Sequence, residues 1–130
     1  MTRTLKFRRL SGGYAVMRRS AETPLPEWET KGDFTSISRT PDELSIVCPT
    51  ESVPNDVDPG TRWRCFKLEG PFPFSQTGVL LSFIEPLSRS EVPIFAISTF
   101  DTDYVLVQEQ FAGAALAALQ QAGHELVSGD

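Results

Sequence analysis

The chain has 130 residues, which fits one ordinary domain or two very small ones, because a module of about 60 residues buries only about 60% of its unfolded surface. Its net charge of −5 argues against nucleic acid as a partner, because phosphate binding needs a concentrated basic face. With 40% hydrophobic residues and no stretch of about 18 consecutive apolar residues, the sequence predicts a globular cytoplasmic protein without a membrane span.

The first 60 residues predict several strands but no long helix. Short strands are expected at residues 5–8, 14–17, 34–38 and 44–48. Prolines interrupt both intervals in which a helix could stand, residues 21–32 and 49–60, because proline lacks the amide proton and crowds the preceding turn. We therefore expect residues 1–60 to form a degenerate module that extends the sheet and covers a complete module.

Residues 61–130 predict that complete module. Its strands are expected at residues 61–68, 93–98, 104–107 and 124–127. Because residues 93–98 are apolar on both faces, this strand is expected to be central and covered by helices. The order β-α-β-β-α-β is the split arrangement of ferredoxin-like α+β sandwiches, with an antiparallel sheet and helices on one face.

Two helices are expected in this second half. The first should begin at Gly78, with Ser75 or Thr77 as its cap, and Pro86 should kink or shorten it. The second should occupy residues 111–123, which carry no charged residue until the terminating glycine.

A short segment occurs twice in the chain. Residues 37–47 and 97–107 both open with Ile-Ser, cross a polar, acidic turn and end in an apolar run that closes with Val. The offset of 60 residues (97 − 37) allows one small module in each half. In this alignment Thr99 stands against Arg39, and Asp103 stands against a glutamate, which suggests that chemistry lies in the second copy.

Neither the cysteines nor the histidine predicts a metal site. Cys48 and Cys65 are far apart and lie in apparent strands, so they are expected to fill the core. A lone His124 directly after a helix-ending glycine is more typical of a capping or surface residue than of a zinc ligand. We expect no metal and no cofactor.

The sequence resembles a known family over most of its length. The segments that carry the resemblance are residues 74–80, 86–87, 94–107 and, more faintly, 34–47. They are similar to the ACT domains of the CASTOR-type arginine sensors, to small bacterial proteins with tandem ACT domains and, more distantly, to aspartate kinase regulatory modules. The resemblance implies regulatory modules that bind a small ligand, often an amino acid, at an interface between ACT units.

A physical reading of the residues agrees with an amino acid ligand. The start of the first helix offers free backbone N–H groups near Thr77, Gly78 and Val79, which suit a carboxylate. At the end of the predicted central strand, Asp103 with Asp101 offers negative charge for an ammonium or a cationic side chain, and Thr99 offers a hydroxyl.

The resemblance adds contacts from the helix and from the strand end. The predicted ligand-binding residues are Gln76, Thr77, Gly78, Val79, Ser82, Phe83, Thr99, Phe100, Asp101 and Asp103. Gln76 stands where the arginine sensors have a glutamate, and Thr102 replaces an aromatic wall. A neutral amino acid or another small metabolite is therefore an equal alternative to arginine as the ligand.

Other interpretations of these residues stay open. Asp103 can cap a tight turn, and Phe83 and Phe100 can belong to the core. Catalysis by Asp101 and Asp103 is disfavoured, because no histidine, activated cysteine or phosphate loop accompanies them. An interaction module without a ligand would dock through the degenerate half and the uncharged last helix, and it would expose an apolar patch.

We expect a non-catalytic, ligand-binding regulatory protein that forms a homodimer, because two copies would assemble four modules. A regulated protein partner is expected, but no residue pattern identifies it.

Overall fold

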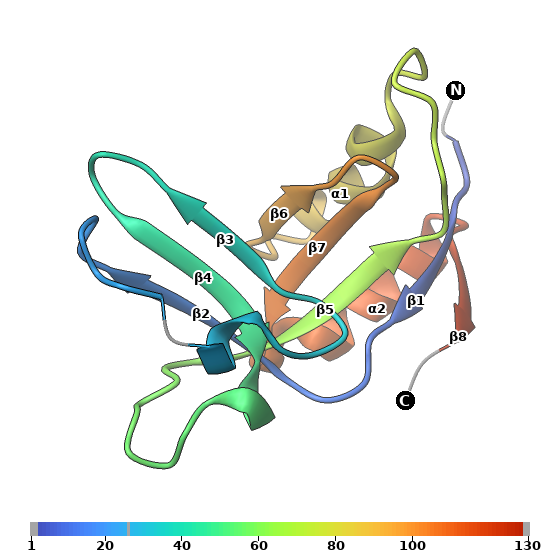
Figure 1. Ribbon diagram of the computed structural model, residues 1–130. Helices are drawn as coiled ribbons and strands as arrows, with labels where there is room; N and C mark the ends of the chain where they lie inside the picture. Colours follow the sequence, from blue (N-terminus) through green and yellow to red (C-terminus); the bar gives the residue numbers. More distant parts are fainter. Residues whose placement is uncertain (1–2, 26, 129–130) are drawn as a thin grey trace. The chain divides into compact units, whose positions relative to one another are not determined.

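The computed structural model describes residues 3–25 and 27–128 and groups the chain into two compact units (Figure 1). The C-terminal unit combines Met1–Ser11 with Arg64–Asp130, and the N-terminal unit is Gly12–Trp63. The sequence placed a boundary between residues 60 and 61. The structure groups the residues differently, because the first strand of the chain pairs inside the C-terminal unit.

The C-terminal unit has the expected β-α-β-β-α-β order. Its elements are β5 (Arg62–Leu68), which begins in the N-terminal unit, α1 (Val79–Arg89), β6 (Phe95–Ser98), β7 (Asp103–Gln108), the 3₁₀ helix η3 (Glu109–Phe111), α2 (Ala112–Gln121) and β8 (Glu125–Ser128). The additional strand β1 (Lys6–Arg9) lies between β5 and β8, so that the strands follow the order β6-β7-β5-β1-β8. Because β1 is antiparallel to β5 but parallel to β8, the sheet is mixed rather than purely antiparallel.

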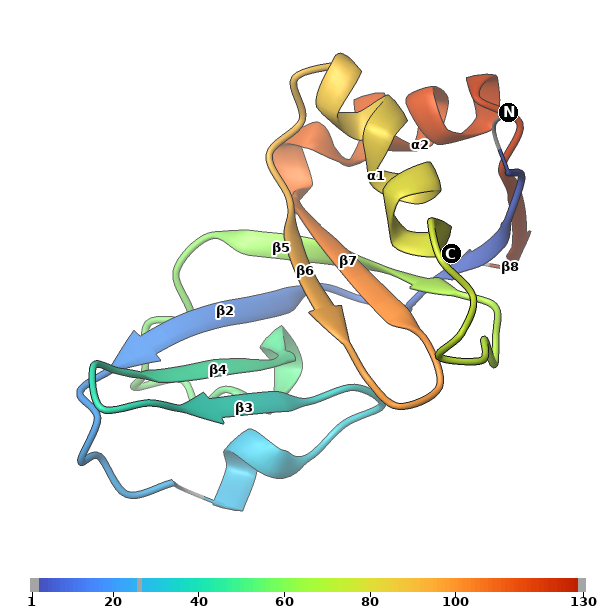
Figure 2. The same cartoon turned by 90° about the horizontal axis from the view of Figure 1, so that it is seen from above.

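Both helices cover one face of this sheet (Figure 2). In α1 the buried side chains include Val79, Phe83 and Leu87, which recur every four residues and so lie on one face of the helix. The ring centroid of Phe7 lies 5.3 Å from that of Phe83 and 5.7 Å from that of Phe66, which joins helix and sheet in one core.

Two details of α1 differ from expectation. Gly78 itself is the residue before the helix, with φ 78°, and within the described residues no side chain caps this end, so the predicted Ser75 or Thr77 cap is wrong. Glycine suits the position because other residues rarely adopt a positive φ. Pro86 lies inside the helix, which continues to Arg89.

The position predicted for β6 in the sheet is also wrong. Among the described strands β6 pairs with β7 alone, so it lies at the edge of the sheet. Its apolar residues resemble those of a central strand, yet Ala96 is exposed and Ile97 is only half-buried.

The N-terminal unit repeats the same topology, with short 3₁₀ helices in place of α-helices among its described residues. Its elements are β2 (Tyr14–Arg19), the 3₁₀ helix η1 (Glu27–Thr30), β3 (Ser36–Arg39), β4 (Leu44–Pro49), the 3₁₀ helix η2 (Thr50–Ser52) and the beginning of β5. The order β3-β4-β2-β5 corresponds to β6-β7-β5-β8 of the C-terminal unit, and among the described strands β2 and β5 pair directly, whereas β1 lies between β5 and β8. The short 3₁₀ helices occupy the two intervals that prolines interrupt, as the sequence predicts.

The two similar hairpins correspond at a different offset from that of the sequence alignment. Arg39 pairs with Leu44, and Ser98 pairs with Asp103, so each hairpin closes over a four-residue turn and the structural offset is 59 residues (98 − 39). The first turn residue is a threonine in both: Thr40 N–H donates to the Glu43 carbonyl at 2.9 Å, and Thr99 N–H donates to the Thr102 carbonyl at 2.8 Å. Thr99 therefore corresponds to Thr40, and Arg39 corresponds to Ser98.

Both cysteines fill the core, as predicted. Cys48 and Cys65 are free and fully buried. Burial raises the pKa of the Cys48 thiol to about 11 and raises the pKa of the Cys65 thiol further, so neither forms a thiolate at neutral pH.

Glu29 on η1 is a fully buried carboxylate in the N-terminal unit. Its Oε2 lies 3.2 Å from Arg19 Nη2, and the Arg19 guanidinium lies 5.5 Å from the centre of the Trp28 ring. Burial raises the pKa of Glu29, and the charge of Arg19 opposes the rise.

Glu29→Gln is expected to remove a pH-dependent penalty from the N-terminal unit. The pKa of Glu29 in the folded protein is raised above its ordinary value of 4.5, which applies to the unfolded chain. Between these two pKa values the folded state binds more protons than the unfolded state, so the contribution of Glu29 to stability falls as the pH rises. Lowering the pH from neutral towards 4.5 should therefore stabilise the wild type relative to Glu29→Gln. Urea unfolding at both pH values measures this, with the exposed Glu22→Gln as control. A stability difference that stays constant with pH would contradict the expectation.

Candidate functional site

A hollow of about 180 Å³ lies in the C-terminal unit, where the loop after β5 meets the β6–β7 turn. Its lining residues are Phe72, Pro73, Phe74, Gln76, Ser98, Thr99, Phe100, Asp101, Thr102 and Asp103. The hollow therefore joins two segments that are more than twenty residues apart in the chain.

Hydrogen bonds fix the turn on one side of the hollow. Phe72 N–H donates to the Asp101 carbonyl at 3.0 Å, which ties the loop after β5 to the turn. The Thr99 hydroxyl donates to the Thr102 carbonyl at 3.0 Å, and the buried Thr102 hydroxyl donates to the Leu68 carbonyl at 2.8 Å. Thr102, predicted to replace an aromatic wall, therefore anchors the turn to the end of β5.

An exposed pair of aromatic rings borders the hollow. Phe74 is 77% exposed and Phe100 is 78% exposed, and their ring centroids lie 4.8 Å apart at an interplanar angle of 81°. This edge-to-face arrangement is favourable, but it leaves apolar surface in water that a ligand or another chain could cover.

The hollow also carries negative charge. Asp101 and Asp103 line it, and no lysine or arginine is among the described lining residues. The Ser98 hydroxyl donates to Asp103 Oδ1, so this carboxylate keeps acceptor capacity for a further donor. Burial raises the pKa of the neighbouring Tyr104, and the charge of Asp101 adds to that rise.

The structure brings part of the predicted site together. Gln76, Thr99, Phe100, Asp101 and Asp103 line the hollow. Its lining does not include Thr77, Gly78, Val79, Ser82 and Phe83.

The residues outside the hollow have other surroundings. Val79 and Phe83 belong to the hydrophobic core. The Ser82 hydroxyl donates to the Gly78 carbonyl at 2.8 Å, and the exposed Thr77 accepts at its carbonyl from Arg3 Nη1 at 3.0 Å.

The predicted contacts did not include five of the lining residues, which are Phe72, Pro73, Phe74, Ser98 and Thr102. The signal that could have found the first three is the aromatic-rich turn of residues 70–74, where two phenylalanines alternate with prolines that exclude a helix.

His124 is buried rather than at the surface, but its backbone N–H donates to the Leu119 carbonyl at 3.0 Å and so caps the end of α2, as predicted. It is 3% exposed, its Nδ1 accepts the Leu5 N–H at 3.0 Å, and its Nε2 lies 2.9 Å from the Ser82 carbonyl. Because Nδ1 is an acceptor, the proton lies on Nε2, which donates to that carbonyl. His124 thus joins the segment before β1 to α1.

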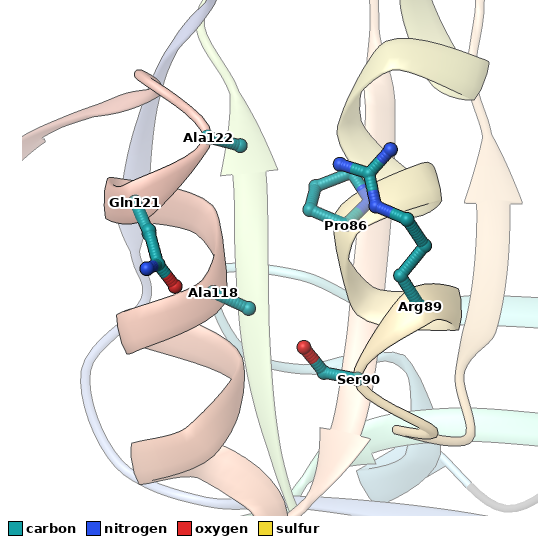
Figure 3. A pocket seen from close by; sticks show the side chains of 6 residues that line it. All are labelled: Pro86, Arg89, Ser90, Ala118, Gln121 and Ala122. Carbon is teal, nitrogen blue, oxygen red and sulfur yellow. The ribbon is translucent and has the colours of Figure 1, made fainter.

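A second hollow, of about 160 Å³, lies between the two helices (Figure 3). Its lining residues are Pro86, Arg89, Ser90, Ala118, Gln121 and Ala122. Ala118 and Ala122 point from α2 towards α1, and Arg89 forms an ion pair with Glu85 at 3.1 Å.

The described part of the chain has neither a membrane-spanning helix nor a cluster of metal-ligating side chains. No described helix is long and apolar enough to cross a membrane. No three histidine, cysteine, aspartate or glutamate side chains of the described part of the chain gather where they could hold a metal ion.

The chain is similar to known protein families and to a solved structure. A family model for the ACT domain matches residues 60–121, and a model for an N-terminal domain matches residues 12–56. A crystal structure of a protein from Agobacterium tumefaciens is 45% identical, with a TM-score of 0.86, and the match covers 97% of this chain and 94% of that one.

Two further proteins are more distant. The cytosolic arginine sensor for mTORC1 subunit 1 from Homo sapiens is 30% identical over 93 residues, which are 65% of this chain but 28% of the sensor, so the chain spans less than a third of this curated relative. The aspartate kinase of Clostridium acetobutylicum shares the fold at 12% identity and a TM-score of 0.64, over 94% of this chain and 35% of the kinase. The matched residues 60–121 hold the elements β5 to α2 of the C-terminal unit, so this part of the chain is identified as an ACT domain.

Proposed function

We propose that the protein is a non-catalytic regulatory protein that binds a small molecule, in the first place an amino acid, in the hollow beside the β6–β7 turn. The observation that carries the proposal is the lining itself, which combines exposed aromatic rings with two acids. Asp101 and Asp103 suit an α-ammonium group, and Phe74 and Phe100 suit an apolar or flat side chain. ACT-domain membership and the name of the arginine sensor agree with this ligand class.

The carboxylate pole of the ligand is proposed to face Gln76 and the start of α1. Gln76 lines the hollow, and the exposed Thr77 and Gly78 follow it directly. The first backbone N–H groups of a helix attract negative charge, and Arg3 beside the Thr77 carbonyl adds a cation at this end. Val79 and Phe83 are left out as contacts, because their side chains are in the core.

Regulation requires that the ligand bind one arrangement of the protein more tightly than another. We propose a cytoplasmic homodimer in which a second copy covers the exposed rings of Phe74 and Phe100, so that ligand binding and subunit arrangement depend on each other. A regulated partner protein would respond to that arrangement.

A thermal-shift screen of the twenty amino acids tests the proposal. At a concentration one hundred times its Kd, a ligand that binds only the folded state stabilises it by about 2.7 kcal/mol. Asp103→Ala should weaken the affinity by about tenfold or more, because a hydrogen bond to a charged group contributes about 1.5–3 kcal/mol. Asp42→Ala is the control and should bind normally, because Asp42 lies in the turn of the N-terminal unit, at the position that corresponds to Asp101. If no amino acid stabilises the folded wild type, the proposal is wrong.

The second candidate function is a protein-interaction module without a ligand. Leu81 on α1 is 62% exposed, and the helix layer carries the hollow of Figure 3. This function predicts that no amino acid raises the melting temperature, while Leu81→Asp abolishes an association that gel filtration of the wild type detects.

A further inference from the structure

We infer that the Arg39 side chain occupies the position in the N-terminal unit that corresponds to the open hollow of the C-terminal unit. The chain therefore carries one ligand site rather than two. The inference rests on the proposed function of the hollow beside the β6–β7 turn. It concerns a side chain that sequence alignment had matched to Thr99 and that the strand register matches to Ser98.

The two places correspond by register and by topology. Arg39 and Ser98 both end the second strand of their unit, opposite Leu44 and Asp103. Side chains of directly paired residues lie on the same face of a sheet. Leu44 is fully buried in the N-terminal core, so the Arg39 side chain leaves the backbone on the core face of the sheet. Ser98 does the same beside Asp103.

In the N-terminal unit the Arg39 guanidinium reaches the loop that follows the first strand. Its Nη2 donates to the Thr23 carbonyl at 3.0 Å, and its Nη1 donates to the Ala21 carbonyl. The corresponding loop of the C-terminal unit follows β5 and contributes Phe72, Phe74 and other residues to the hollow. The guanidinium therefore lies between the same two structural features, the hairpin end and the loop after the first strand, that border the hollow.

The exchange of Arg39 for Ser98 explains the difference between the units. An arginine has five N–H donors on a long side chain and can satisfy carbonyls across a gap, whereas the serine hydroxyl has one donor and bonds to the adjacent Asp103. The N-terminal unit also has Leu44 in place of that acid. A guest in this place must supply the donors that Arg39 now supplies, which is the chemistry of a guanidinium or ammonium ion.

The test removes the Arg39 side chain and adds a small cation that can bind in the position it leaves. In Arg39→Ser, titration with methylguanidinium chloride should cause saturable NMR shifts of the amides of Ala21 and Thr23, with no such shifts in the wild type. Arg18→Ser is the control, because Arg18 is an exposed arginine that also donates to a carbonyl, that of Asp42 at 2.9 Å. If folded Arg39→Ser shows no saturable shifts of these amides, as in the wild type, Arg39 only links the hairpin to the loop and the inference is overturned.

The reciprocal variant fills the C-terminal hollow. Ser98→Arg should lower the affinity for whichever amino acid stabilises the wild type by at least about tenfold, while Ser88→Arg on the exposed side of α1 should not. Unchanged affinity in folded Ser98→Arg would also overturn the inference. If no amino acid binds the wild type, the proposed function fails, but the methylguanidinium titration still decides whether Arg39 occupies a place for a guest.

Discussion

Phe83→Ala is expected to lower the free energy of unfolding of the C-terminal unit by about 3–5 kcal/mol, the usual cost of removing a buried aromatic ring. Phe83 is fully buried, and its ring centroid lies 5.3 Å from that of Phe7 and 5.5 Å from that of His124. Because a domain of this size is stable by only about 5–15 kcal/mol, the loss would be visible at once in urea unfolding followed by circular dichroism.

The control for this variant lies on the same helix. Leu81→Ala removes an apolar side chain that is 62% exposed, so it should change the stability by no more than about 0.5 kcal/mol. The pair of variants separates a core role of Phe83 from the ligand contact that the family resemblance implies. A Phe83→Ala protein as stable as Leu81→Ala, with impaired ligand binding, would contradict the core role.

His124→Phe is expected to cost about 2–4 kcal/mol, although the new ring keeps the approximate shape and the apolar contact with Phe83. The reason is that the Leu5 N–H and the Ser82 carbonyl, now bonded to the two ring nitrogens, would be left without these partners in a buried place. A buried polar group without a partner costs about 1–3 kcal/mol.

Two measurements check the His124 expectation. Urea unfolding gives the loss of stability, and hydrogen exchange of the Leu5 amide should become faster in His124→Phe. His124→Gln, whose amide offers both N–H donors and a carbonyl acceptor, is the matched control and should retain more stability than the phenylalanine variant. Equal stability of wild type and His124→Phe would show that the two hydrogen bonds contribute little.

Local patterns in the sequence were sufficient for the elements of the C-terminal unit. The helical spacing of Val79, Phe83 and Leu87 predicts α1, and the β6–β7 hairpin follows from two apolar runs around a polar turn. Long-range pairing has no such local signal. The pairing of Phe7 with Leu68, which inserts β1 into this unit, is invisible to any pattern within a short window.

The candidate site divides along the same line. Thr99, Phe100 and Asp101 lie in one turn and Asp103 follows it directly, so a local motif finds them together. Phe83 was included because of its position in the motif, but the direction of a helical side chain depends on which face packs against the sheet. The alignment offset of 60 was wrong by one residue for a similar reason, because Ile-Ser identity aligned the copies although the hydrogen-bonded turn sets their register.

The position of β1 has a consequence for the order in which the chain can acquire structure. A strand made from residues 6–9 waits for β5 before it gains its first partner and for residues 125–128 before it gains its second. Although β1 is made before both of its partners, it is thus among the last strands of this sheet to be enclosed, and contacts between such distant parts of a sequence are slow to form. Until residues 125–128 have been made, one edge of β1 stays open to pairing with other chains.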